Sequence, residues 1–418
     1  MTKTFVNRLK IGAGCLLLPF LLLLGIPFTV SGGETIKIGK LEPMSGFMAH
    51  WGEMSEAACQ MVAEEQNAKG GLLGKKVEFV FEDNEYRPEV AIRKAKKLIL
   101  EAKVDFIGTG VGSHISTAMN KLAASYKKIY LNFGGISDSI QGKEFSLYGF
   151  RMVNSSYQSA AALVEFVKTK PFRKFYMINP DYTFGHEYAA AFKQQMKIRF
   201  PVAQIVGEDY HPLGTKDFAP YVTKIMASGA DAIFAGTFST DARLLVKAAR
   251  GIGLKAPFPF FSYAMVESTT AEQLRDEAVG ISSVNGWSVG VNTPENNAMV
   301  ARWHKKFKDK RYDWWWPSSN VAWEFMGWPM FFAAVEKAKS LESEKIIDAL
   351  EGLRYETPVG WYTMRKCDHQ VILPMFAFEI KPGKNKWFDW PWIGPDVMTI
   401  PADSVAPPAT ADYNPRCP

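Results

Sequence analysis

The sequence has few of the residues and spacings that form metal or catalytic sites. Its 418 residues include six histidines and four cysteines, and the histidines are scattered, with no His-x-x-x-His pair and no Cys/His pair. The chain also has no Gly-x-Ser-x-Gly elbow, and Gly74-Lys75-Lys76 lacks the upstream glycine and the Ser or Thr of a phosphate loop. We therefore expect no metal, no cofactor and no catalytic activity.

Charge of one sign is not in large excess. Lys and Arg number 49 and Asp and Glu 43, and three of the basic residues (Lys3, Arg8 and Lys10) lie close to the N-terminus. Without these three, the excess is too small to imply nucleic-acid binding. No run of basic residues alternates with aromatics either, so we expect no nucleic-acid partner.

Long apolar runs are absent outside the N-terminus. There, Ile11–Val30 is broken by Pro19 and Pro27 and is followed by small residues. This order of charged, apolar and small residues is typical of a secretory signal, and we expect residues 1–32 to be removed on export. An uncleaved membrane anchor is the alternative, because the run is nearly long enough to span a bilayer.

Three cysteines follow the leader. Cys59 lies in a helical pattern, where we expect it to be a small core residue, whereas Cys367 and Cys417 lie in turn-rich sequence. An exported chain meets an oxidising compartment, in which a disulfide between Cys367 and Cys417 would persist. Two free thiols are an equally good interpretation of the sequence alone.

Strand-like and helix-like segments alternate along the chain. Strands are expected at residues 36–41, 77–82, 104–108, 129–133, 174–178, 204–209, 232–235 and 259–262. Their regular alternation with helices predicts an α/β fold in which parallel sheets are covered by helices. The pattern restarts after residue 154, and the length exceeds what one core usually holds, so we expect two lobes with a ligand cleft between them.

A strand that ends in glycines is the clearest candidate for a binding site. Val104–Gly108 continues into Thr109-Gly-Val-Gly112 and a helix that begins near Ser113. Glycines let the backbone approach a ligand, and a helix start presents free N–H groups to an anion. The Gly-x-Gly-x-Gly spacing differs from the dinucleotide fingerprint, and the strand is the third rather than the first. The pattern therefore favours a small carboxylate over a nucleotide.

A tryptophan cluster has two interpretations. Trp314–Trp316, Trp323 and Trp328 could stack on a carbohydrate, but Trp323, Met326 and Met330 fall at helical spacing. Such spacing is typical of a buried helix face. We favour the core interpretation.

Several motifs resemble the leucine/isoleucine/valine-binding protein family. They are Gly39-Lys-Leu-Glu-Pro-Met-Ser-Gly46, Asn67-Ala-Lys-Gly-Gly-Leu-Leu-Gly-Lys75, Glu82-Asp83-Asn84, Lys216-Asp-Phe218, Gly229-Ala-Asp-Ala-Ile-Phe-Ala-Gly236 and Thr357-Pro-Val-Gly360. The resemblance spans about residues 35–382. It implies a monomeric periplasmic solute-binding protein of an ABC importer, which docks transiently on a membrane permease.

The resemblance also implies a fold and its boundaries. The expected fold is the type I periplasmic-binding fold, with two Rossmann-like lobes joined by three crossing strands, and the lobes close over the ligand by a hinge motion. The expected divisions are 33–154 plus 286–370 for lobe 1, 155–285 plus 371–395 for lobe 2, and 396–418 for a C-terminal tail.

Family roles can be transferred only to matching positions. The ligand-binding residues that the resemblance implies are Trp51, Gly112, Ser113, Phe133, Gly134, Gly135, Phe184, Phe238 and Tyr263. Gly112 stands where the family has a serine, with Ser113 next to it, and Phe184 and Phe238 stand where the family has tyrosines. Capture of a carboxylate at the start of the helix, by Ser113 and backbone N–H groups, is therefore expected.

The family's partner for the ligand's ammonium group is missing. Tyr263 and Ala264 stand where the family has a glutamate, and Glu267 follows three positions later. A buried ammonium without a partner costs several kcal/mol, so either Glu267 or Asp181 supplies the charge or the ligand has no ammonium. We expect an apolar or aromatic carboxylate, with a hydrophobic amino acid as the alternative.

Two other classes of protein could share this scaffold. An exported enzyme would need an acid–base pair in the cleft, and the matched positions are Trp, Gly, Ser and Phe, which are poorly suited to proton transfer. A sensory ligand-binding domain would need a transmembrane or signalling segment after residue 382, and we expect none. A binding protein is the favoured interpretation.

Overall fold

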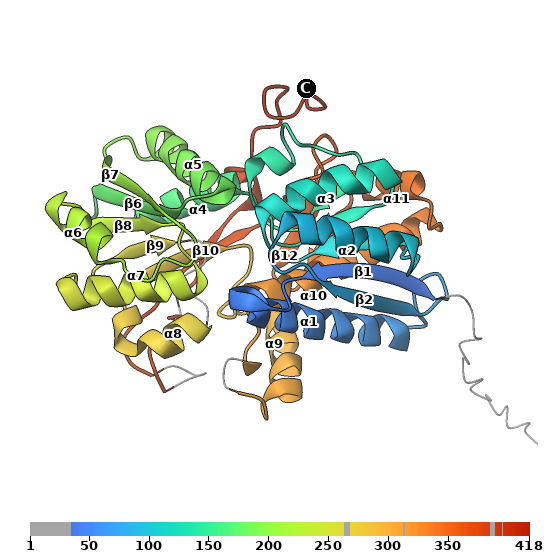
Figure 1. Ribbon diagram of the computed structural model, residues 1–418, viewed down its shortest axis with the longest axis horizontal. Helices are drawn as coiled ribbons and strands as arrows, with labels where there is room; N and C mark the ends of the chain where they lie inside the picture. Colours follow the sequence, from blue (N-terminus) through green and yellow to red (C-terminus); the bar gives the residue numbers. More distant parts are fainter. Residues whose placement is uncertain (1–34, 263–267, 312–313, 385–388, 395) are drawn as a thin grey trace, which may run out of the picture.

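The computed structural model describes residues 35–262, 268–311, 314–384, 389–394 and 396–418. Two α/β halves lie side by side (Figure 1), each built on its own sheet. The predicted α/β fold with parallel sheets is confirmed.

The first half contains a five-stranded parallel sheet in the order β2-β1-β3-β4-β5. Its strands are β1 (Ile36–Glu42), β2 (Val77–Asp83), β3 (Phe106–Thr109), β4 (Tyr130–Asn132) and β5 (Gly149–Arg151). Helices α2 (Pro88–Leu100) and α3 (Ser113–Tyr126) cover one face, and α1 (Ala49–Ala68) and α10 (Ser319–Ala338) cover the other (Figure 1). The two faces carry separate apolar clusters, as expected for strands buried on both sides.

The second half contains a seven-stranded sheet in the order β15-β14-β10-β9-β8-β6-β7. Its strands are β6 (Lys174–Pro180), β7 (Gln204–His211), β8 (Ala232–Ala235), β9 (Phe260–Ser262), β10 (Ile281–Asn285), β14 (Met375–Glu379) and β15 (Met398–Ile400). Strands β6 to β10 are parallel, and β14 and β15 join them antiparallel. The accompanying helices are α4 (Ser156–Val167), α5 (Thr183–Arg199), α6 (Ala219–Ala227), α7 (Ser239–Ile252), α8 (Ser268–Leu274) and α12 (Ala402–Val405).

The remaining elements lie on the first half. They are α9 (Pro294–Phe307), α11 (Ser343–Leu350) and the antiparallel strands β11 (Arg354–Thr357), β12 (Gly360–Met364) and β13 (Val371–Ile372). In the described part of the chain, short 3-10 helices lie at Gly46–Met48, Asp138–Ile140 and Arg275–Ala278. Among the described residues, no helix is both long and apolar enough to cross a membrane.

The chain changes sheets three times. It passes between the two large sheets after β5, returns to the first half after β10, and enters the seven-stranded sheet again between β13 and β14. Residues 398–400, which were expected in a C-terminal tail, form β15 and pair with β14. Three connections therefore join the two halves.

Local sequence explains the start of the second half. Ser155 is the N-cap of α4, and its hydroxyl accepts a hydrogen bond from the backbone N–H of Gln158. The Gln158 side chain in turn accepts from the backbone N–H of Ser155, which completes a capping box. This capping box begins α4 directly after the first crossing.

Candidate functional site

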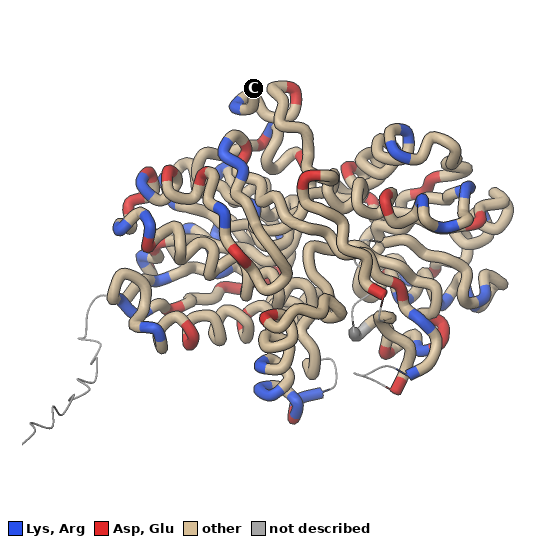
Figure 2. Tube along the Cα trace, turned by 180° about the vertical axis from the view of Figure 1, so that it is seen from behind, with Lys and Arg blue, Asp and Glu red and all other residues tan. Residues whose placement is uncertain are grey.

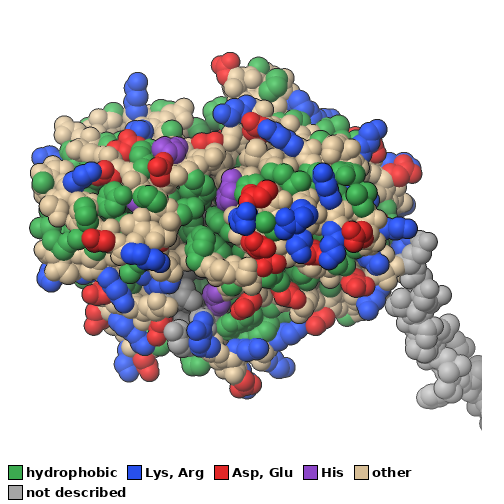
Figure 3. Space-filling model, viewed as in Figure 1, with side chains coloured by type: hydrophobic (Ala, Val, Ile, Leu, Met, Phe, Trp, Pro, Cys, Tyr) green, Lys and Arg blue, Asp and Glu red, His purple; other side chains and the backbone are tan. Residues whose placement is uncertain are grey.

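A cavity lies where the two halves meet. It encloses about 440 Å³ of space, part of it open to solvent, and Figure 3 shows hydrophobic side chains gathered in the hollow between the halves. Its lining residues are Met48, Trp51, Tyr86, Val111, Gly112, Ser113, Gly134, Ile136, Tyr182, Phe184, Phe238 and Trp323. The loops after the carboxyl ends of parallel strands supply most of these residues, as is usual for ligand sites in α/β folds.

Six of the nine expected site residues line this cavity. They are Trp51, Gly112, Ser113, Gly134, Phe184 and Phe238. Phe133 and Gly135 do not line it, and both are buried beneath its wall. Tyr263, like Ala264 and Glu267, lies outside the described residues.

Gly112 and Ser113 form the start of α3. Gly112 is the N-cap at φ +95°, a conformation that favours glycine, and Ser113 is the first helical residue. The hydroxyl of Ser113 accepts a hydrogen bond from the Ser137 backbone N–H at 3.2 Å, and it can still donate its own proton. With the first N–H groups of the helix, which have no partner inside it, this hydroxyl can bind a carboxylate.

Gly134 is required by the close approach of two loops. A Cβ at this position would lie 1.7 Å from the carbonyl oxygen of Gly110. The loops after β3 and β4 are therefore packed backbone to backbone at the floor of the cavity. This contact holds Gly134 and Ser113 on the same wall.

Phe133 and Gly135 support that wall from below. The ring of Phe133 packs against Trp328, with 4.8 Å between ring centroids, and the ammonium of Lys40 lies 4.5 Å from its centre. The backbone N–H of Gly135 donates to Asn132 Oδ1 at 2.7 Å. Both residues make these contacts inside the fold, and their contacts with a ligand remain predictions.

Two tyrosines that were not expected meet across the cavity. Tyr86 follows β2 and Tyr182 follows β6, and their hydroxyl oxygens are 3.4 Å apart. The ring of His114 contacts both, at 4.9 Å and 5.7 Å between centroids. Burial raises the pKa of Tyr86 to about 12 and lowers the pKa of His114, so both groups are neutral at pH 7. This pair joins the two halves at the edge of the cavity.

The Glu82-Asp83-Asn84 motif explains how Tyr86 reaches the cavity. Asp83 Oδ1 accepts from the backbone N–H groups of Met44 and Glu85, and Asn84 Oδ1 accepts from that of Tyr86. These bonds hold Glu85 and Tyr86 at positive φ, where L residues are uncommon. The motif was recognised in the sequence, but the turn that it forms was not.

The wall from the second half is aromatic. Phe184 is the second residue of α5 and Phe238 is the N-cap of α7, and their rings meet edge to face with 6.2 Å between centroids. Neither carries the hydroxyl of the tyrosine found at these places in the family that the sequence resembles. Apart from Tyr182, the described side chains that the second half contributes to the cavity are therefore apolar.

Among the described residues that line the cavity, none is a carboxylate. Asp181, one of two candidate partners for a ligand ammonium, instead pairs with His186 at 2.8 Å, and both side chains are more than half exposed. The described part of the site therefore contains groups for a carboxylate and an apolar body.

A buried ionic cluster lies on β1, α1 and α10, next to the ring of Phe133. The Lys40 ammonium contacts Glu42 at 2.8 Å and Glu324 at 2.7 Å, and the Ser55 hydroxyl lies within hydrogen-bond distance of both carboxylates, at 3.1 Å and 2.7 Å. Burial raises the pKa of Glu42 to about 7, although the attraction of Lys40 opposes this. Cys59 is buried, as expected, and it belongs to this cluster because its thiol donates to Glu324.

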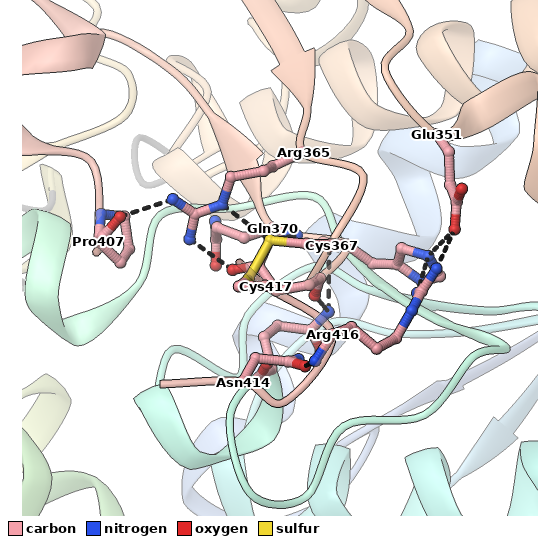
Figure 4. The surroundings of a disulfide bond; sticks show 11 residues. Glu351, Arg365, Cys367, Gln370, Pro407, Asn414, Arg416 and Cys417 are labelled. Atoms are coloured by element: carbon pink, nitrogen blue, oxygen red, sulfur yellow. Dashed lines mark hydrogen bonds and ion pairs between the residues drawn. A yellow bond between two sulfur atoms is a disulfide. The ribbon is translucent and has the colours of Figure 1, made fainter. Parts of the chain in front are cut away.

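The C-terminus is tied to the first half by a disulfide (Figure 4). Cys367 and Cys417 are bonded across 50 residues. Beside them, Arg416 contacts Glu351 at 2.7 Å, and the Asn414 amide donates to the Gln141 carbonyl at 2.7 Å. The hydrogen bond from His369 and that from Arg416 lower the pKa of Glu351 to about 2.

Charges of both signs are interspersed along the chain (Figure 2). Among the described residues, no group of three or more His, Cys, Asp or Glu side chains is placed to hold a metal ion. The described residues that line the cavity are uncharged, and half of them are aromatic.

Comparisons with known proteins agree with this architecture. The family model described as periplasmic binding protein matches residues 35–386. Leu/Ile/Val-binding protein homolog 4 of Brucella melitensis is 27% identical over 369 residues, which cover 84% of this chain and 85% of that protein.

Two solved structures have the same fold. One is the leucine-, isoleucine-, valine-, threonine- and alanine-binding protein of Brucella ovis in a closed conformation, with a TM-score of 0.80, 24% identity and coverage of 92% of this chain and 99% of that one. The other is a solute-binding protein of an ABC transporter from Rhodopseudomonas palustris in complex with p-hydroxybenzoic acid, with a TM-score of 0.79, 23% identity and coverage of 88% and 98%.

Proposed function

The chain belongs to the periplasmic binding protein family, and on that premise we propose that it is the solute-binding component of an ABC importer. In this proposal, residues 1–32 direct export to the periplasm and are removed. Residues 33–154 with 286–370 form one lobe, and residues 155–285 with 371–395 form the other. The protein acts as a monomer, binds its ligand between the lobes, docks on the membrane permease and catalyses no reaction.

We propose an apolar or aromatic carboxylate as the ligand class. The observation that carries this proposal is the cavity itself, in which Ser113 at the start of α3 faces a chamber walled by Trp51, Phe184, Phe238 and Trp323. A carboxylate at the helix start is stabilised by the N–H groups and the helix dipole. Aromatic walls then bury the apolar body of the ligand.

Both ligand classes, aromatic carboxylates and hydrophobic amino acids, are named for similar proteins. The Rhodopseudomonas palustris structure holds p-hydroxybenzoic acid, whereas the Brucella ovis protein is named for aliphatic amino acids. The replacement of two tyrosines by Phe184 and Phe238 supports the first class, because an apolar wall suits an aromatic ring better than an ammonium group. We therefore place aromatic carboxylates before hydrophobic amino acids.

The role of Ser113 can be tested by substitution. Ser113→Ala is expected to weaken binding of benzoate by ~1–3 kcal/mol, the range for a hydrogen bond to a charged group, which is roughly five- to 150-fold in Kd. Isothermal titration calorimetry of the purified protein measures this change. Ser125→Ala is the matched control, because Ser125 lies at the other end of α3 and donates to the Leu122 carbonyl. Equal affinities for the wild type and Ser113→Ala would remove Ser113 from the site.

A further inference from the structure

One cavity-lining residue has a polar group without a partner among the described residues. Trp323 lines the cavity and is only 2% exposed, and its indole N–H is buried without an acceptor among the described residues. By contrast, the buried indoles of Trp303 and Trp328 donate to the Trp314 carbonyl and to Glu324. A buried N–H without a partner costs free energy comparable to that of a lost hydrogen bond. The position of Trp323 on the cavity wall suggests that the ligand supplies the missing acceptor.

Trp323 and Ser113 approach the cavity from opposite faces of the same sheet. Ser113 begins α3, which packs with α2 on one face, and Trp323 is on α10, which packs with α1 on the other (Figure 1). A ligand whose carboxylate lies at Ser113 therefore directs its other end toward the α10 side. The two donors therefore reach the cavity from different sides, in addition to the hydroxyls of Tyr86 and Tyr182.

We propose that the indole N–H of Trp323 is the specificity determinant for the far end of the ligand, where it selects a hydrogen-bond acceptor. This inference rests on the proposed function and narrows it to aromatic carboxylates that carry an acceptor oxygen opposite the carboxylate. An ammonium group has only donors, and it would leave the Trp323 N–H unsatisfied and place two donors against each other. The same N–H therefore disfavours a ligand whose ammonium lies at this end.

Three benzoates of similar size separate the possibilities. Benzoate has no polar group at its far end, 4-hydroxybenzoate has an acceptor oxygen, and 4-aminobenzoate has N–H donors and a poor acceptor. We expect the wild type to bind 4-hydroxybenzoate roughly two- to tenfold more tightly than 4-aminobenzoate, the range of one neutral hydrogen bond. This order of affinities, measured by calorimetry, tests the proposal without any substitution.

Trp323→Phe keeps an aromatic ring and removes the N–H. We expect this variant to lose most of the preference for 4-hydroxybenzoate over 4-aminobenzoate, and its affinity for benzoate reports any general loss that comes from the smaller ring. Trp303→Phe is the matched control, because it removes another buried indole N–H that lies away from the cavity and should leave the preference intact.

The outcomes are distinct. The role of Trp323 is overturned if the wild type binds the benzoates without a preference for 4-hydroxybenzoate. It is also overturned if Trp323→Phe weakens the binding of all three benzoates equally. Either result leaves the proposed function standing. If the wild type binds none of the three benzoates, the proposed ligand class fails, and the inference fails with it.

Discussion

At the scale of residues, the resemblance predicted several cavity residues that lie in the first turn of a helix. Trp51, Ser113 and Phe184 were found in this way, and all three line the cavity. Trp323 was expected to be a core residue because of its helical spacing, and it is both buried and part of the cavity wall. A helix that packs on a sheet near the cleft can do both, and spacing alone does not separate the two roles.

The buried ionic cluster could not be found from local patterns. Lys40 and Glu324 are 284 residues apart along the chain, and they meet only because α10 returns to the sheet beside β1. Nothing in either local sequence indicates that a lysine and a glutamate will be buried. Long-range pairs of this kind require the folded structure.

Glu42 makes the stability of the protein depend on pH. Its pKa is raised from an ordinary value near 4.5 to about 7, so the folded state holds a proton in a pH range where the unfolded state has lost it. The stabilisation is complete below the unfolded pKa and is lost as pH rises through the folded pKa. We therefore expect the free energy of unfolding of the wild type to fall relative to that of Glu42→Gln between about pH 4.5 and pH 7. Urea denaturation at a series of pH values measures the difference, and parallel pH profiles would contradict the expectation.

At the scale of elements, the alternation of strands and helices predicted β1 to β4 and β6 to β9 in the correct order. The shorter β5 has three residues, and its pairing with β4 follows from position rather than from an alternating pattern. The antiparallel strands β14 and β15 come after the helical segments and join a sheet whose other strands lie far earlier in the chain. Because their pairing is non-local, β14 and β15 could not be predicted from the local sequence pattern.

The packing of the loops after β3 and β4 can be tested at Gly134. Gly134→Ala would place a Cβ 1.7 Å from the Gly110 carbonyl oxygen, and the backbone on both sides has to move. We expect a loss of stability of roughly 1–3 kcal/mol, the range for overpacking, together with weaker ligand binding. Gly251→Ala is the control, because a Cβ there, in α7, meets no atom within 4 Å and should stabilise the helix by about 0.5–1 kcal/mol. Thermal denaturation should shift in opposite directions for the two variants, and equal shifts would contradict this account.

At the scale of the whole molecule, the three crossings and the C-terminal segment determine how the halves are connected. The motifs predicted two lobes, but the return of residues 398–400 to the second sheet and the attachment of Asn414 to the first half were not visible in them. The disulfide that fixes the end of the chain remained one of two equal alternatives in the sequence.

The disulfide should stabilise the protein as a whole. A cross-link across 50 residues restricts the unfolded chain and typically contributes ~2–4 kcal/mol. We expect Cys367→Ser/Cys417→Ser to be less stable than the wild type by about this amount in urea denaturation. Reductant should lower the stability of the wild type to that of the variant and leave the variant unchanged. A wild type that is insensitive to reductant while it unfolds would show that the bond contributes nothing.

The central claim is that this periplasmic binding protein takes an aromatic carboxylate in preference to an amino acid. The most direct measurement is calorimetric titration of the ligand-free wild type with 4-hydroxybenzoate and, separately, with L-leucine. We predict that 4-hydroxybenzoate binds with one site per chain and at least tenfold more tightly than L-leucine. Tight binding of L-leucine with weak or no binding of 4-hydroxybenzoate would contradict the account.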